Sequence, residues 1–201
     1  MQRKIFDVLA SAGGLVMVVV LVVAGGLLMW GYSFANSNVH NQLNEQQITF
    51  PAKAAFAHPV AGSEITPSMI GTVSKYAGQP LVTGQEAAVY ANDFIAVHLQ
   101  EIGGGKTYSQ LSAAAQADPT NTVLAGQVAT VFKGTTLRGL LLEAYAFSTF
   151  GQIALIASII SFILAGVMLL LVLFGLVHIR RVPEDQEFPK VHAPEKILET
   201  V

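Results

Sequence analysis

The segment IALIASIISFILAGVMLLLVLFGLV, Ile153 to Val177, decides the fold of this chain. It contains no charged residue and exceeds the roughly 20 residues with which a helix crosses a hydrocarbon core about 30 Å thick. A second run, VLASAGGLVMVVVLVVAGGLLMW from Val8 to Trp30, has the same properties. The two runs predict an all-α membrane protein with transmembrane helices over residues 8–31 and 151–178, and a mainly helical domain between them.

The composition agrees with a membrane protein and excludes several functions. Of the 201 residues, 52% are hydrophobic and 12% are charged, about half the usual charged fraction of about 25%. The net charge of −2 gives no footprint for a polyanion, which argues against a nucleic-acid partner. The chain has no cysteine, which excludes disulfides, thiolate metal sites and cysteine nucleophiles.

The first apolar run has an alternative interpretation as a cleaved signal peptide. It follows Arg3 and Lys4, and Ser33-Phe34-Ala35 has the small-x-small spacing of a cleavage site. The apolar core of a signal peptide is about 7–15 residues long, however, and this run is longer. We therefore expect an uncleaved anchor, and the sequence leaves open whether the helix is ever processed.

Positive charges near the ends of the two runs predict the orientation. Arg3 and Lys4 precede the first run, and Arg180 and Arg181 follow the second. Because cytoplasmic flanks are rich in Lys and Arg, we expect a two-pass protein of the cell membrane with both termini cytoplasmic. Residues 1–7 and a disordered tail over 179–201 then lie inside, and residues 32–150 form an extracytoplasmic domain.

The first half of the predicted outer domain begins with a polar, proline-containing stretch. Residues 36–67 are expected to run extended, with a short strand at 47–50. A helix then begins at Thr83, because Glu86 follows it at the spacing of a capping box. The glycines at 103–105 are expected to end that helix.

The second half of this domain is predicted to be helical and to lead into the second anchor. A short helix is expected over 108–117. Asp118 and Pro119 suit the N-cap and first position of another helix, which Gly134 is expected to end. Residues 135–152 are strongly apolar, so we expect a helix there that continues into the second anchor.

Gly105-Lys106-Thr107 has the appearance of the end of a nucleotide-binding loop. A P-loop needs another glycine five positions before the last one, with a strand before the loop. Gln100 occupies that position, and a helix is expected to precede the glycines. The sequence therefore argues against a nucleotide partner.

Three stretches carry a resemblance to a known family. They are NEQQITFP, GQPLVTGQEAAVYANDFIAVHLQEIGGGKTYSQL and TLRGLLLEAYAFSTFGQIALI. In these the chain resembles a group of two-helix membrane proteins of actinobacteria that are often labelled aromatic ring-opening dioxygenases. It departs from them by a longer segment around 113–131 and a longer C-terminal tail. The resemblance implies a topology and a cell-membrane location, but no catalytic or binding residues.

The residues offer little for dioxygenase chemistry. Ring opening by non-haem iron needs two His and one carboxylate around the metal. Only His98 has a carboxylate at helical spacing, that of Glu101, and a third ligand would have to be His40 or His58. No Gly-x-Ser-x-Gly nucleophile is present. We expect a surface histidine beside an exposed glutamate, no metal, no cofactor and no enzymatic activity.

Small residues in both anchors predict a helix-packing or partner face. Ala157, Ser161 and Ala165 recur at intervals of four in the second anchor, and Gly14 and Gly26 lie on a comparable ridge of the first. Such stripes let helices approach closely. The sequence leaves three alternatives open, namely chance composition, pairing of the two anchors, and contact with a partner or second copy.

Three functions remain as hypotheses. The leading one is a non-enzymatic accessory, scaffold or assembly subunit of an actinobacterial envelope or respiratory membrane complex, in contact with the lipid bilayer and with a membrane-protein partner or itself. The alternative is an extracytoplasmic ligand- or lipid-binding or sensor module. A remote third is a non-haem iron oxygenase. The candidate apolar ligand or partner surface comprises Arg138, Leu140, Leu141 and Tyr145.

Overall fold

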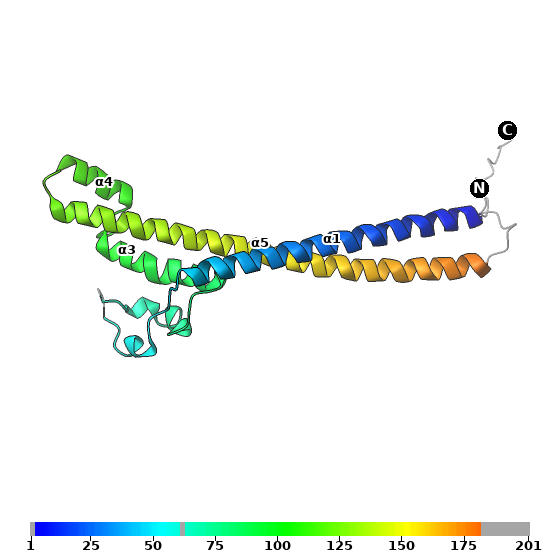
Figure 1. Cartoon of the computed structure of the whole chain (residues 1–201), viewed down its shortest axis with the longest axis horizontal. Helices are drawn as coiled ribbons and strands as arrows, with labels where there is room; N and C mark the ends of the chain where they lie inside the picture. Colours follow the sequence, from blue (N-terminus) through cyan, green and yellow to red (C-terminus); the bar gives the residue numbers. More distant parts are fainter. Residues whose placement is uncertain (1–2, 61–62, 182–201) are drawn as a thin grey trace, which may run out of the picture. The chain divides into compact units, whose positions relative to one another are not determined.

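The computed structural model describes residues 3–60 and 63–181. Of these residues 81% are helical and none lies in a strand, which confirms the predicted all-α class but not the short strand expected at 47–50. Two helices are long and apolar enough to cross a membrane, α1 (Arg3–Glu45) and α5 (Thr122–Arg181) (Figure 1). The predicted tail falls outside the described residues from position 182 onward.

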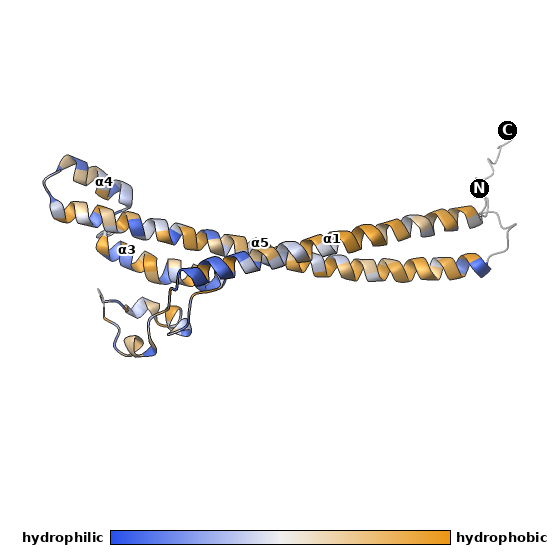
Figure 2. Ribbon diagram, viewed as in Figure 1, coloured by the Kyte–Doolittle hydropathy of each residue, from blue (hydrophilic) through white to orange (hydrophobic). Residues whose placement is uncertain are grey.

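The most apolar parts of these two helices are exposed. In the most apolar 18-residue stretch of each helix, only 11% is buried in α1 and 17% in α5. The core helix of a soluble protein would bury most of such a surface. In Figure 2 the apolar colours run along the N-terminal part of α1 and the C-terminal part of α5. Lipid is the environment that fits these surfaces.

The chain divides into two compact units, of which the first comprises residues 1–29 and 156–201. Its described part is an antiparallel pair of helices, since Gly25 lies against Ser158 while Ser11 lies near Gly175. One set of buried residues recurs every seven positions, with Ser11, Val18 and Gly25 on α1 and Ser158, Ala165 and Val172 on α5, and Ser161 is buried as well. A seven-residue repeat is the packing period of paired helices that coil around each other.

The second unit, residues 30–155, contains the hydrophobic core cluster. Between α1 and α5 the chain forms three short 3₁₀ helices, η1 (Lys53–Ala57), η2 (Pro67–Met69) and η3 (Val73–Tyr76). Helix α2 (Gly84–Val89), the π-helical turn η4 (Tyr90–Ile95), α3 (Ala96–Ile102) and α4 (Tyr108–Ala117) follow. The core cluster draws on α1, on the loop helices and on α5, with Val39, Leu43, Phe50, Met69, Leu81 and Leu141 among its members.

The extended conformation predicted directly after the first anchor is wrong. Helix α1 continues to Glu45, although Asn36, Ser37 and Asn38 are weak helix formers. Val39 and Leu43 are buried in the core, and this packing outweighs the local propensity. In place of the predicted strand, the described residues contain a single antiparallel bridge between Thr49 and Pro80.

The starts of α2 and α4 agree with the sequence prediction. Thr83 and Glu86 form the capping box at the start of α2, with the Glu86 carboxylate accepting a 2.8 Å bond from the Thr83 amide. Helix α4 covers the predicted residues, 108–117. The π-helical turn inside the first of these helical stretches was not predicted.

The predicted boundaries at Asp118 and Gly134 are wrong. Asn121 caps α5, since its side-chain oxygen accepts the Leu124 amide at 2.9 Å, while the Asp118 carboxylate accepts bonds from Thr120 and Asn121. Helix α5 passes through Gly134 without ending. A Cβ at Gly134 would lie 2.5 Å from Leu99 Cδ2, so this glycine allows α3 to pack closely rather than ending a helix.

Candidate functional site

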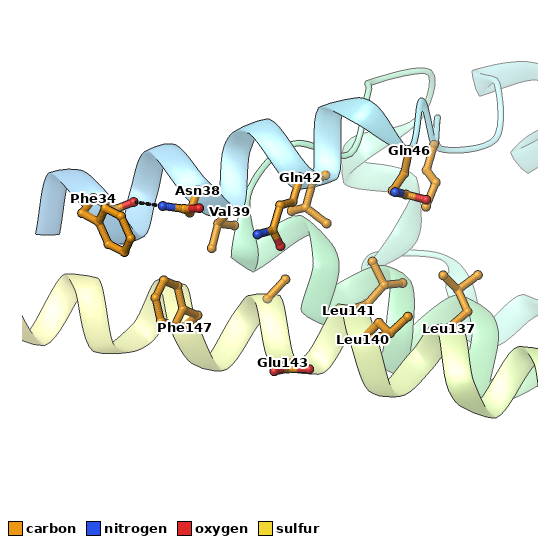
Figure 3. Close-up of a pocket in the computed structure, with 13 residues that line it drawn as sticks. Phe34, Asn38, Val39, Gln42, Gln46, Leu137, Leu140, Leu141, Glu143 and Phe147 are labelled. Carbon is orange, nitrogen blue, oxygen red and sulfur yellow. Dashed lines mark hydrogen bonds between the residues drawn. The ribbon is translucent and has the colours of Figure 1, made fainter. Parts of the chain in front are cut away.

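The second unit contains a groove of about 470 Å³ between α1 and α5 (Figure 3). From α1 come Phe34, Asn38, Val39, Gln42 and Leu43, and Gln46 and Ile48 follow the helix. From α5 come Leu137, Leu140, Leu141, Glu143, Ala144 and Phe147. The volume lies within the range of about 300–1,000 Å³ that is typical of small-molecule sites.

Apolar side chains form most of this lining. Val39, Leu43 and Leu141 belong to the buried core, so they fix the inner wall of the groove. Leu140 is 59% exposed and Phe147 44% exposed, and both present apolar surface that the chain leaves uncovered. Binding a ligand that removes such apolar surface from water lowers the free energy.

The polar groups of the groove are amides and one carboxylate. Asn38 and Gln42 follow Phe34 along α1 at intervals of four, so these three lie on one edge of the helix. Gln46 lies in the turn directly after Glu45, the last residue of α1. Asn38 donates to the Phe34 carbonyl at 3.1 Å. Within the described chain no hydrogen bond is made by the side chains of Gln42 and Gln46, and the exposed Glu143 side chain has no ion pair. None of the described lining residues is basic.

The structure brings together half of the surface predicted from Arg138, Leu140, Leu141 and Tyr145. Leu140 and Leu141 line the groove, but Arg138 and Tyr145 do not. Arg138 instead contacts the π-helical turn, where Nε donates to the Ala91 carbonyl at 3.2 Å and a terminal nitrogen to Asn92 Oδ1 at 2.8 Å. A Cβ at Gly84 would meet the Tyr145 backbone at 3.3 Å, so Tyr145 lies where α2 packs.

No family model, curated protein or solved structure matches the chain. The groove must therefore be interpreted from its own chemistry.

All five small residues predicted as a packing face lie in the first unit, and most of them face the other helix of the pair. Ser161 donates a 2.8 Å hydrogen bond to the Leu21 carbonyl, Ala165 is buried, and a Cβ at Gly14 would lie 2.7 Å from Val172 Cγ2. Ala157 is half-buried. Nothing lies within 4 Å of a Cβ at Gly26, so this glycine points away from the pair.

Sequence reasoning missed two central residues of this face, Gly25 and Ser158. Ser158 is fully buried and donates a 2.8 Å hydrogen bond to the Gly25 carbonyl. The prediction followed small residues at intervals of four, whereas the buried positions recur at seven. A heptad count through Ser11 and Val18 would have located Gly25, and one through Val172 and Ala165 would have located Ser158.

The first unit also contains a cavity of about 250 Å³ near one end of the helix pair. Asp7, Ser11 and His178 are among its lining residues. Asp7 Oδ2 is buried and has no hydrogen-bond partner within the described chain. Sequence reasoning did not single out Asp7, because it lies just before the predicted span.

The histidine considered as an iron ligand makes a local contact. His98 Nδ1 pairs with the Phe94 carbonyl at 2.8 Å, and its ring packs on the Phe94 ring at 4.6 Å between centroids. In the described part of the chain, no three His, Asp or Glu side chains are grouped so that they could hold a metal ion.

The amides around Gly105-Lys106-Thr107 are already bonded within the chain. The Gly105 amide donates to Gln100 O at 2.8 Å, Lys106 to Gly103 O at 3.1 Å and Thr107 to the Gln110 side chain at 2.9 Å. A phosphate-binding loop must direct such amides at its ligand. The stretch is a helix stop followed by a capping box.

Proposed function

We propose that this chain is a non-enzymatic two-pass membrane protein whose second unit binds an apolar or amphipathic molecule in the groove between α1 and α5. The observation that carries the proposal is a groove of about 470 Å³ with an uncovered apolar lining and a few polar groups at its edge. This combination is typical of ligand sites.

The position of the groove along α1 supports a ligand that comes from lipid. Phe34 lies one turn beyond Trp30, the last residue of the first apolar run, and the two rings stack at 5.7 Å between centroids. Aromatic residues favour the membrane interface. In the orientation that the terminal charges favour, both termini are cytoplasmic and the groove begins just outside the outer interface of the cell membrane.

Photo-crosslinking with a diazirine-bearing long-chain fatty alcohol tests the proposal. In nanodiscs, the full chain should be labelled at residues 34–48 and 137–147 as well as in the two apolar spans, which serve as an internal reference. Labelling of the groove no stronger than that of α4 would refute the proposal.

Two matched variants localise the labelling. Leu140→Glu places a charge on an exposed lining residue, and Val123→Glu makes a similar change at a side chain that is 72% exposed outside the groove. We expect Leu140→Glu to reduce groove labelling at least tenfold relative to the spans, because a carboxylate is costly to bury. Val123→Glu should leave it unchanged.

A second candidate is the accessory or assembly subunit. It is favoured by large apolar side chains that α5 exposes in the second unit outside the groove, such as Phe132 and Phe150, because partner surfaces are often apolar. Gentle solubilisation of native membranes tests it. Recovery of a stoichiometric companion that Phe150→Ala weakens would support a subunit role, and recovery of the chain alone would count against it.

A further inference from the structure

We propose that the groove selects a single-chain amphiphile with an uncharged, hydroxyl-bearing headgroup, drawn from the bilayer, and discriminates against anionic amphiphiles. This inference rests on the proposed function and specifies its ligand class. It follows from the distribution of charge and hydrogen-bonding groups around the groove (Figure 3).

The apolar lining accommodates the hydrocarbon chain. Phe34 and Phe147 come from opposite helices, and Leu137 and Leu140 continue the apolar surface along α5. A volume of about 470 Å³ is in the lower half of the range of small-molecule sites, which suits one chain better than two. If the chain is buried there, each additional methylene should tighten binding about fourfold until the groove is full.

The polar edge determines which headgroup is accepted. Gln42 and Gln46 offer amide donors and acceptors that no other described residue uses, and hydroxyl groups can satisfy both kinds. Glu143 lines the groove from α5 and gives this lining a negative charge. Its carboxylate can accept a hydrogen bond from a hydroxyl group of the ligand.

An anionic headgroup would lack a counter-charge at this edge. None of the described lining residues is basic, and the nearby Arg138 is engaged by Ala91 and Asn92. A carboxylate beside Glu143 would face like charge, which is the usual means of rejecting a wrong ligand.

Competition against the crosslinkable fatty alcohol tests this selectivity on the full chain in nanodiscs. Monoacylglycerol should displace the probe from residues 137–147 at a concentration at least tenfold lower than the fatty acid of equal chain length, at a pH where the acid is ionised. An alkyltrimethylammonium of the same length should also displace it less well than monoacylglycerol, because its headgroup can neither donate nor accept a hydrogen bond at the Gln42 and Gln46 amides. Stronger displacement by either charged competitor would overturn the inference.

A charge-neutral variant identifies the responsible group. Glu143→Gln should improve displacement by the fatty acid at least threefold and leave that by monoacylglycerol within twofold. Glu101→Gln, at an exposed residue on α3 outside the groove, should change neither. Equal fatty-acid binding in the wild type and in Glu143→Gln would overturn the assigned role of this residue.

The outcomes separate the two proposals. If the probe never labels the groove, the proposed function itself fails. If the probe labels the groove but fatty acid displaces it as well as monoacylglycerol does, the ligand site stands and the headgroup selectivity is wrong.

Discussion

The hydroxyl of Ser158 on α5 donates a 2.8 Å hydrogen bond to the carbonyl oxygen of Gly25 on α1. One turn further along α5, Ser161 makes an equivalent bond to Leu21. Both carbonyls lie in a continuous helix, so each serine uses an acceptor lone pair that the helix leaves free. Because lipid offers no competing water, these bonds and the close approach at Gly25 hold the pair together.

Removing both hydroxyls should weaken the helix pair. For Ser158→Ala with Ser161→Ala we expect a loss of about 1–2 kcal/mol in the free energy of unfolding, since interhelical bonds in membranes average about 0.6 kcal/mol and reach about 1.7 kcal/mol each. Unfolding in mixed detergent and dodecyl sulfate micelles measures this. Ser33→Ala, at an exposed serine on α1, is the control. Equal stability of the double variant and the control would contradict the account.

Two adjacent glycines of α1 should respond in opposite ways to alanine. A Cβ at Gly14 would lie 2.7 Å from Val172 Cγ2, whereas a Cβ at Gly13 meets nothing within 4 Å. Overpacking against a stiff valine should cost Gly14→Ala about 1–3 kcal/mol. Gly13→Ala should be neutral or stabilising by about 0.5–1 kcal/mol. The same unfolding assay decides, and equal effects would mean that the helices do not pair in this register.

Arg138 should stabilise the second unit through the π-helical turn. The Ala91 carbonyl accepts the Ala96 amide and also Arg138 Nε, so the side chain bridges α5 and η4. Arg138→Gln should lower the free energy of unfolding by about 1.5–3 kcal/mol, as expected for a lost hydrogen bond to a charged group.

Two further variants make the Arg138 test specific. Arg138→Lys should not restore the stability, because an ammonium lacks the planar set of donors that reaches both acceptors. Lys133→Gln removes a nearby charge from α5 and should stay within about 0.5 kcal/mol of the wild type. Full stability of Arg138→Lys would show that charge alone matters.

Alkaline pH should destabilise the second unit through Tyr90. Burial raises the pKa of the Tyr90 phenol above its ordinary value of 10.0, and the negative charge of Glu64 raises it further. The folded state therefore favours the protonated phenol. The corresponding stability is fully present below pH 10.0 and is lost as pH rises through the folded-state pKa.

Thermal unfolding midpoints between about pH 9 and pH 11 test this expectation. The wild type should lose stability more steeply across this range than Tyr90→Phe. Tyr108→Phe, at an exposed tyrosine on α4, should follow the wild type. Parallel curves for the wild type and Tyr90→Phe would contradict the assignment.

Local chemistry in the sequence was sufficient for several elements of the fold. The two apolar runs identified the long helices, and the Thr83–Glu86 spacing identified a capping box because its partners are three residues apart. Tertiary packing decided the rest. Val39 and Leu43 keep a polar segment helical, and Gly134 lies inside a helix because Leu99 packs against it.

The groove was only partly predictable for the same reason. Leu140 and Leu141 stood out as an apolar pair, but the opposite wall comes from the end of α1 and the turn after it, residues 34–48. That segment was expected to be extended, so its one-sided row of amides could not be recognised. Arg138 was assigned to the candidate ligand or partner surface, because its actual acceptors, the Ala91 carbonyl and Asn92, are distant in sequence.

The most direct test of the account is the sidedness of the second unit. Because the chain has no cysteine, single cysteines can be placed at Thr120, in the turn before α5, and at Arg181, the last residue of α5. A membrane-impermeant maleimide added to intact cells should label Thr120→Cys, and it should label Arg181→Cys only after permeabilisation. Labelling of Arg181→Cys alone in intact cells would contradict the two-pass arrangement with an external groove.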